Sequence, residues 1–261
     1  MYNEYVRKDI SLNGQVLFSE KGFSMIAGPC AVENEKDLVA TAELLIKNNV
    51  KMMRGGAYKL RTSPYDFQGL GDEGLQILSR VAKAHNLFSV TEIISLKELD
   101  LFEKYIDIII IGTRNMYNYQ LLKEIGKISK PVILKRGMSA TVKEWLLAAE
   151  YIRMGGNENV VFCERGIRTF DNNLRYTFDL ATAIHVANKH NFHVITDPSH
   201  ATGNADLITP LVLASLVTGI QGCMIEIHPE PSKALSDGDQ MIDFDRFDNL
   251  MSRVEQLKAI R

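Results

Sequence analysis

The chain has 261 residues, of which 46% are hydrophobic and 24% charged, and its 30 basic and 32 acidic side chains leave a net charge of −2. This balance excludes a nucleic-acid or other polyanionic partner bound through bulk charge, and the length suits a single α/β barrel with a large core. Three cysteines are a poor disulfide framework, no segment approaches a membrane span, and the first residues lack signal-peptide features, so we expect a cytoplasmic protein with no membrane partner.

Residues 5–20 are predicted to form a small β-hairpin. Asn13-Gly14 is a strong signal for a two-residue turn, and apolar side chains stand on both sides of it. We find no chemical groups of interest in this 1–22 extension. We expect it to cap the fold that follows or to contact another subunit.

From residue 23 onwards, short apolar runs alternate with amphipathic stretches, which is typical of repeated βα units. Strands are predicted at 23–27, 50–54, 87–91, 106–111, 132–135, 160–163, 193–196 and 223–226. Helices are predicted near 35–48, 72–85, 95–104, 117–128, 141–154, 174–190, 204–218 and 241–258. The pattern predicts one (β/α)8 TIM barrel over residues 23–261, preceded by the hairpin. A doubly wound open sheet is the alternative.

Ionisable side chains gather where the predicted strands end, and in a TIM barrel this is the catalytic end. The basic ones are Arg54, Lys59, Arg61, Arg114, Lys135 and Arg165. The carboxylates of Glu92, Glu164 and Asp197 can balance only part of this charge. The surplus predicts an anionic ligand, most simply with more than one phosphate or carboxylate, because arginine binds such groups through two hydrogen bonds.

A second group of strand-end residues has the chemistry of metal ligands: Cys30, His200, Glu226 and Asp237. One thiolate, one imidazole and two carboxylates are a suitable set for a divalent transition metal. Each residue alone has an ordinary explanation in core packing, ion pairing or a turn, and only their joint position favours a metal site. Cys163 and Cys223 lie within apolar runs and are expected in the core, whereas His228 could contact substrate or support the metal ligands.

Seven segments resemble, in the same order, those of 3-deoxy-D-arabino-heptulosonate 7-phosphate (DAHP) synthase in its compact type I-beta form. They are GPCAVE at 28–33, RGGAYKLRTSP at 54–64, IGTRN at 111–115, LKRG at 134–137, CERGIRTF at 163–170, DPSH at 197–200 and IEIHP at 225–229. The resemblance runs from about residue 15 to the C-terminus. It implies that phosphoenolpyruvate and erythrose 4-phosphate are joined to give DAHP and phosphate, the first step of the shikimate pathway to chorismate and the aromatic amino acids.

The resemblance also assigns roles to residues. The metal ligands match Cys30, His200, Glu226 and Asp237, and the ion could be manganese, iron, cobalt or zinc. The phosphoenolpyruvate site matches Arg54, Lys59, Arg114, Lys135 and Arg165, and the erythrose 4-phosphate site matches Arg61 and Thr62, with Ser63 nearby. Lys59 is the expected proton donor to the aldehyde oxygen, since a lysine among cations can have a lowered pKa. Glu92, Glu164 and Asp197 are expected to complete the substrate-binding rim.

Two departures from the family pattern concern the substrate end. The family usually has proline where this chain has Leu60, and a basic pair where it has Asn204-Ala205. The sister enzyme 3-deoxy-D-manno-octulosonate 8-phosphate synthase uses arabinose 5-phosphate and typically has lysine-alanine-asparagine-arginine where this chain has residues 59–62. That enzyme is one alternative, and a non-catalytic barrel that binds phosphorylated ligands is another.

The family usually forms dimers or tetramers, so we expect a homodimer or homotetramer. Some relatives carry an added ligand-sensing or chorismate mutase domain. Since little precedes residue 20, we expect no feedback inhibition by aromatic amino acids acting on this chain alone. A partner chorismate mutase could still confer it.

Overall fold

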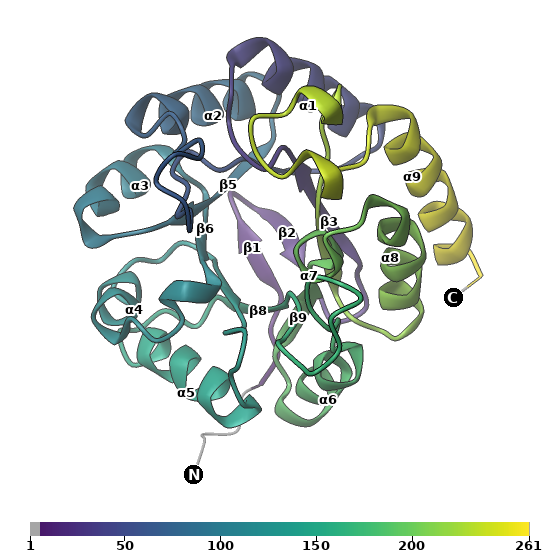
Figure 1. Cartoon of the computed structure of the whole chain (residues 1–261). Coiled ribbons are helices and arrows are strands. Elements are labelled where there is room, and N and C mark those ends of the chain that lie inside the picture. Colours follow the sequence, from purple (N-terminus) through teal and green to yellow (C-terminus); the bar gives the residue numbers. More distant parts are fainter. Residues whose placement is uncertain (1–5, 261) are drawn as a thin grey trace.

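Eight parallel strands form a closed barrel in the computed structural model, which describes residues 6–260 (Figure 1). Residues 1–5 of the predicted N-terminal extension lie outside this range. The barrel strands are β3 (Ser24–Gly28), β4 (Met52–Arg54), β5 (Phe88–Ile93), β6 (Ile108–Ile111), β7 (Val132–Lys135), β8 (Val160–Glu164), β9 (His193–Thr196) and β10 (Gly222–Glu226). They follow one another in chain order, and β10 pairs with β3 to close the ring. The predicted (β/α)8 fold is confirmed.

The strands are apolar on both faces because each face meets a different part of the core. β6 consists of four buried isoleucines, as expected for a parallel strand covered on both sides. Ile108 and Ile110 point into the barrel, whereas Ile109 and Ile111 pack against the surrounding helices. Since side chains alternate along a strand, this parity divides every barrel strand into inward and outward positions.

The helices surround the barrel (Figure 1). They are α1 (Glu35–Lys47), α2 (Asp72–Ala84), α3 (Leu99–Tyr105), α4 (Tyr119–Ile125), α5 (Val142–Arg153), α6 (Leu180–His190), α7 (Pro198–Thr202), α8 (Ile208–Val217) and α9 (Phe244–Lys258). α5 shows how they are fixed: Thr141 and Glu144 form a capping box, and Trp145 is fully buried and donates to the Leu134 carbonyl at 3.1 Å. Across residues 6–260, every helix is too short or too polar to cross a membrane.

One helix boundary and one additional helix differ from the prediction in ways that matter for the site. The helix predicted over 174–190 begins only at Leu180, because Ile167 and Thr177 exchange two backbone hydrogen bonds and hold the preceding segment extended. The short helix α7 was not predicted. Asp197 caps it by accepting from the His200 backbone N–H at 3.1 Å, Pro198 occupies its first position, and Gly203 at φ +65° ends it.

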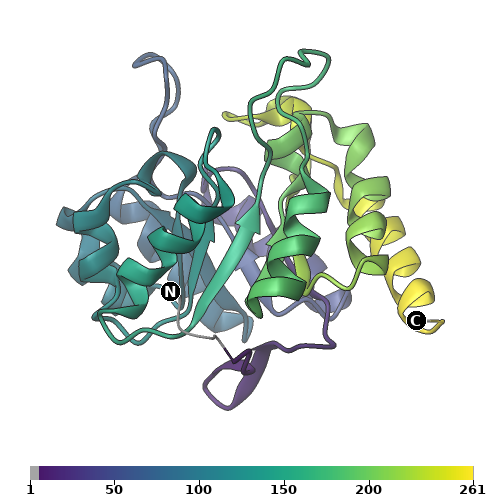
Figure 2. The same ribbon diagram turned by 90° about the horizontal axis from the view of Figure 1, so that it is seen from below.

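The predicted hairpin is present and closes one end of the barrel. β1 (Ile10–Leu12) pairs antiparallel with β2 (Gln15–Phe18) through a turn in which Asn13 and Gly14 both have positive φ, at 49° and 76°. The hairpin lies below the barrel, opposite the long loops (Figure 2). Ile10, Leu17 and Phe18 are buried in the same cluster as the inward-facing barrel residues, so apolar side chains of the hairpin fill this end of the barrel interior.

Replacing Phe18 by alanine should lower the free energy of unfolding by about 3–5 kcal/mol, because its fully buried ring closes the inner core and leaves a cavity when removed. Urea unfolding followed by circular dichroism measures the change. Val16→Ala is the control, since Val16 lies in the same strand but is 48% exposed, and it should change stability by less than about 0.5 kcal/mol. Equal effects from the two substitutions would mean that the hairpin does not close the core.

Candidate active site

The inward-facing positions of the barrel change from apolar to ionised at the carboxyl ends of the strands. The pairs are Met52 and Arg54 on β4, Val90 and Glu92 on β5, Ile133 and Lys135 on β7, and Met224 and Glu226 on β10. The apolar members belong to the inner core, and the ionised members lie one layer above it. The chain thereby places charged groups at the end of the barrel opposite the hairpin.

A cavity opens above this layer. Nine of the predicted site residues line it: Lys59, Arg61, Thr62, Glu92, Arg114, Lys135, Arg165, His200 and Asp237. Arg54 lines a smaller recess together with Lys59, Glu92, Lys135 and His200. The six predicted basic residues, which lie in four separate segments of the sequence, are therefore neighbours in space.

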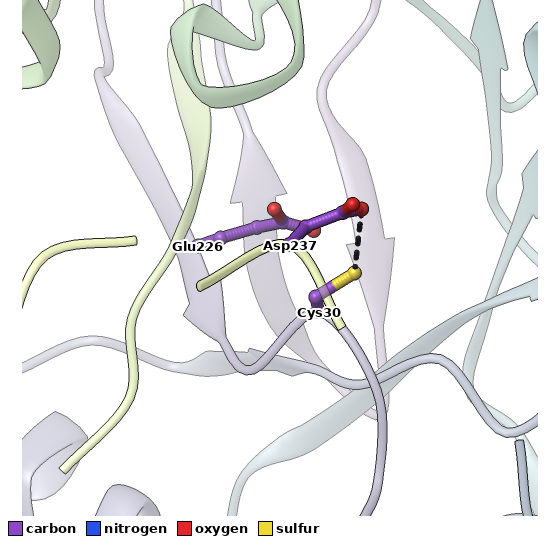
Figure 3. A group of neighbouring side chains, drawn as sticks. All are labelled: Cys30, Glu226 and Asp237. Carbon is purple, nitrogen blue, oxygen red and sulfur yellow. Dashed lines mark hydrogen bonds between the residues drawn. The ribbon is translucent and has the colours of Figure 1, made fainter. Parts of the chain in front are cut away.

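Cys30, Glu226 and Asp237 lie close enough together to bind one ion. Their ligand atoms are all within 4.8 Å of one another, and Cys30 Sγ lies 3.2 Å from Asp237 Oδ2 (Figure 3). His200 approaches the same group, with Nε2 at 3.3 Å from Glu226 Oε1. Asp237 adopts a left-handed conformation, φ 55°, which aspartate tolerates better than most residues and which turns the chain directly after Ser236.

These residues fit a divalent transition metal. Glu226 Oε1 is buried and accepts no hydrogen bond. Although burial alone would raise it, contacts with His200 and Arg54 hold the pKa of Glu226 at about 2, so the group is ionised. Burial and the nearby Glu226 raise the pKa of the Cys30 thiol to about 12, so a bound cation would have to displace its proton. The sulfur, nitrogen and oxygen donors match the preference of such metals.

Asp197 holds His200 and Lys135 in place rather than facing the cavity. Its Oδ2 lies 2.7 Å from His200 Nδ1 and 2.9 Å from Lys135 Nζ. Burial opposes ionisation, but the contacts with His200 and Lys135 hold the pKa of Asp197 well below its usual range. A carboxylate on Nδ1 orients the imidazole and leaves Nε2 for a metal.

Two buried arginines have donors without partners. Arg54 and Arg165 are each 5% exposed, yet Nε and Nη1 of both make no hydrogen bond. Arg54 Nη2 lies 3.0 Å from Glu226 Oε1, and the Arg165 guanidinium stacks on the Tyr176 ring at 4.5 Å. Buried donors without partners cost free energy. Their presence beside an open cavity indicates that an anion completes the site.

Lys59 contacts the metal-ligand group directly. Its Nζ lies 2.8 Å from Cys30 Sγ and 3.1 Å from the Cys30 carbonyl oxygen. Burial lowers the pKa of Lys59, but the charges of Cys30 and Glu226 outweigh burial and raise it above its ordinary value. The expectation of a lowered pKa is therefore wrong for this structure, because the nearest charges around Lys59 are negative.

Glu92 and Arg114 take their expected places on the cavity wall. Glu92 fits only because position 112 is glycine, since a Cβ there would lie 1.9 Å from Glu92 Oε1.

Of residues 61–63, which were predicted to bind the aldehyde substrate, only Arg61 and Thr62 line the cavity. Arg61 Nη1 donates to Ser236 Oγ at 2.8 Å, and Thr62 lines the cavity. Ser63 does not line it, because its Oγ accepts from the Tyr65 backbone N–H at 3.2 Å within the loop. Leu60, the departure from the family pattern, does line the cavity.

Glu164 does not belong to the cavity. It follows Phe162 at the outward-facing positions of β8, and its Oε2 accepts from Arg136 Nη1 at 3.1 Å while Oε1 accepts from the Gly166 backbone N–H at 2.6 Å. Asp179 binds the same guanidinium at 2.9 Å. The expected role of Glu164 in substrate binding is not supported. It fixes the turn that presents Arg165.

His228 also faces away from the cavity, with Nε2 3.8 Å from Glu33 Oε2 and Nδ1 accepting from the Glu230 backbone N–H. Cys163 and Cys223 are buried in the core, as predicted.

Three residues that were not predicted contact predicted site residues: Ser236, Gln240 and Tyr176. A fourth, Arg175, contacts Gln240. Ser236 Oγ lies 3.1 Å from Cys30 Sγ. Its position next to Asp237 was the only signal that could have identified it. Gln240, Arg175 and Tyr176 lie in segments whose sequence carries no recognisable pattern of site residues.

Comparison with known proteins was consistent along the chain. The model of the DAHP synthetase I family matches residues 10–261. A phospho-2-dehydro-3-deoxyheptonate aldolase of Thermotoga maritima is 45% identical over 244 residues, which cover 94% of this chain and 72% of the relative. A 2-dehydro-3-deoxyphosphooctonate aldolase of Geobacter sulfurreducens is 26% identical over 271 residues, covering 97% of this chain and 98% of the relative.

Solved structures agree with this assignment. The crystal structure of the phospho-2-dehydro-3-deoxyheptonate aldolase (DAHP synthase) of Thermotoga maritima matches with a TM-score of 0.94 at 42% identity, covering 98% of this chain and 74% of that chain. A truncated form of 3-deoxy-D-arabino-heptulosonate 7-phosphate synthase from the same organism matches with a TM-score of 0.90 at 40% identity, covering 98% and 93%. The barrel, its hairpin and its charged mouth are thus those of an enzyme, and the chain belongs to the DAHP synthetase I family.

Proposed function

We propose that this chain condenses phosphoenolpyruvate with erythrose 4-phosphate to give DAHP and inorganic phosphate. The observation that carries the proposal is the pair of buried arginines with unpartnered donors, Arg54 and Arg165, beside the Cys30, Glu226 and Asp237 group. A site with several cations suits two phosphorylated substrates, and the adjoining donors suit a metal that acts on an aldehyde.

Enzymes of this family generally depend on a metal ion. We assign the ligands to Cys30, His200, Glu226 and Asp237, with manganese, iron, cobalt or zinc as the ion. When bound, the ion would supply Lewis-acid polarisation of the aldehyde oxygen. The protein supplies the positions of the ligands, with Asp197 orienting His200 and Ser236 Oγ 3.1 Å from Cys30 Sγ.

The two substrates are assigned to adjoining parts of the cavity. Phosphoenolpyruvate is bound by Arg54, Lys59, Arg114, Lys135 and Arg165, whose charges neutralise its phosphate and carboxylate. Erythrose 4-phosphate is bound at the mouth by Arg61 and Thr62, with Ser63 in the loop that carries them. In this arrangement the enol carbon attacks the aldehyde, water adds to the resulting cationic carbon, and phosphate leaves by C–O cleavage. Lys59 delivers the proton to the aldehyde oxygen, and Glu92 orients the water or the neighbouring cations.

Three further assignments belong to this proposal: a cytoplasmic location, a homodimer or homotetramer, and a chorismate mutase as a partner that could confer feedback control. The sister activity on arabinose 5-phosphate is the competing function, since relatives bearing that aldolase name match at 26–28% identity.

The deciding assay compares phosphate release from phosphoenolpyruvate with erythrose 4-phosphate and with arabinose 5-phosphate, both with added manganese. We expect kcat/KM to favour the four-carbon sugar, because Arg61 and Thr62 stand where the sister enzyme has other residues. Preference for the five-carbon sugar would assign the sister function and give Leu60 the larger influence. No release with either sugar would contradict both and leave a barrel that binds phosphorylated ligands without this reaction.

A further inference from the structure

Gln240 connects the proposed metal ligand Glu226 to the rim of the cavity. It ends the short 3-10 turn Gly238–Gln240 that follows Asp237, and its side chain is buried at 3% exposure. Its Nε2 donates to Glu226 Oε2, and its Oε1 accepts from Arg175 Nη1 at 2.7 Å.

The two neighbours fix the direction of the Gln240 amide. A carboxylate can only accept hydrogen bonds and a guanidinium can only donate them, so the NH₂ group must face Glu226 and the oxygen must face Arg175. In the opposite orientation the amide oxygen would face the Glu226 carboxylate and the NH₂ group would face the Arg175 guanidinium, so neither hydrogen bond could form. Because the amide is buried, that mismatch would be costly. Arg175 therefore determines how Gln240 presents its donor to Glu226.

The hydrogen bond from Gln240 leaves the two oxygens of Glu226 in different surroundings. Oε2 accepts from Gln240, whereas Oε1 lies 3.0 Å from Arg54 Nη2 and 3.3 Å from His200 Nε2, on the side of the other proposed metal ligands. Glutamate has three rotatable side-chain bonds and could otherwise offer either oxygen or turn away. Loss of a hydrogen bond that holds a metal ligand in one orientation commonly weakens metal affinity by roughly 10–100-fold.

We propose that Gln240 is a positioning residue that directs Glu226 Oε1 towards the metal, and that Arg175 acts on the same carboxylate through Gln240. The inference rests on the proposed function, because it takes Glu226 as a metal ligand. Arg175 lies in the segment between β8 and α6 that also carries Arg165, so this chain of hydrogen bonds links the substrate-binding rim to the metal ligands.

The test measures binding of Co²⁺ to the full chain without substrates, by titration against a competing chelator and by the visible absorption of the bound ion. Gln240→Met keeps the length of the side chain but removes both hydrogen bonds, and should raise the Co²⁺ Kd roughly 10–100-fold and change the absorption spectrum. Arg175→Met should raise the Kd less. The double variant should match Gln240→Met alone, since the proposed connection from Arg175 to Glu226 runs through Gln240.

Arg168→Met is the matched control, because Arg168 is an exposed arginine in the same segment; its Co²⁺ Kd should equal that of the unmodified chain. Thermal melting of each variant verifies folding. If Gln240→Met does not fold, Arg175→Met alone carries the test, because this side chain is exposed and its loss does not open the core.

An unchanged Co²⁺ Kd and spectrum in the folded variants would overturn the inference. If the effects of Gln240→Met and Arg175→Met on the Co²⁺ Kd are additive in the double variant, Arg175 does not act through Gln240. If the unmodified chain binds Co²⁺ no better than Cys30→Ser, the proposed metal site fails and the inference fails with it. That outcome is recognised before any Gln240 variant is compared.

Discussion

Treatment with a chelator is expected to abolish phosphate release, and Cys30→Ser should lower the rate at least about a hundredfold at a fixed metal concentration. A metal at an aldehyde oxygen supplies several kcal/mol to the barrier, and each 1.36 kcal/mol is a factor of about ten in rate. Cys30 offers the only sulfur within the Cys30, Glu226 and Asp237 group, so serine would remove the donor that a soft metal prefers. The measurement is the rate with metal, with chelator, and after metal is restored.

Cys223→Ser is the control for this experiment. Cys223 is also buried, but its Sγ lies 2.9 Å from Thr196 Oγ1 in the core, where a hydroxyl can make the same contact. It should keep both metal binding and chelator sensitivity. A chelated enzyme with far less than one ion per chain and an undiminished rate would contradict a catalytic role for the metal.

The sequence predicted the barrel well because every strand carries its own signal. Runs such as Ile108–Ile111 are apolar enough to be buried on both faces, and each is followed by an amphipathic helix. Several of the strand runs end in ionised residues, which predicted Arg54, Lys135 and Glu226 at one end of the barrel. Closure of the ring by β10 and β3 then brought them together.

The outward position of Glu164 could have been predicted from the alternation of side chains along β8. Cys163 lies in the inner core and Phe162 in the outer one, so alternation places Arg165 inward and Glu164 outward. Arg136, directly after β7, has the same outward parity as Leu134 and contacts Glu164 outside the barrel. A strand-end carboxylate is therefore a site candidate only when its parity matches that of the inner core.

Other features could not have been read from the chain. The contact between Gln240 and Arg175 joins two irregular segments 65 residues apart, and no periodic pattern relates them. The direction of the Lys59 pKa shift depends on which groups lie nearest to its Nζ. The folded structure places Cys30 and Glu226 there, and they raise the pKa more than the neighbouring Arg54 lowers it.

Lys59→Met is expected to lower kcat by about 10²–10⁴, the range typical of a lost general acid. Lys59 Nζ stands between the cavity and Cys30, at 2.8 Å from Sγ, and no other lysine contacts that group among residues 6–260. Its raised pKa keeps the group protonated at neutral pH, so it holds a proton that it can donate to a developing alkoxide. Lys233→Met is the control, because Lys233 is exposed and pairs with Glu230 on the surface.

The balance between kcat and KM distinguishes proton donation from simple binding. A donor acts in the transition state, so its removal should lower kcat and kcat/KM to a similar extent while KM for phosphoenolpyruvate changes little. A lysine that only neutralises substrate charge would instead raise KM with kcat preserved. A Lys59→Met enzyme with normal turnover would remove the proton-donor role, and a rise confined to KM would leave Lys59 as a binding residue beside Arg54. Since Lys59 also touches Cys30, Co²⁺ affinity must be measured in the same variant, and an unchanged Kd would assign the lost rate to the proton rather than to the metal.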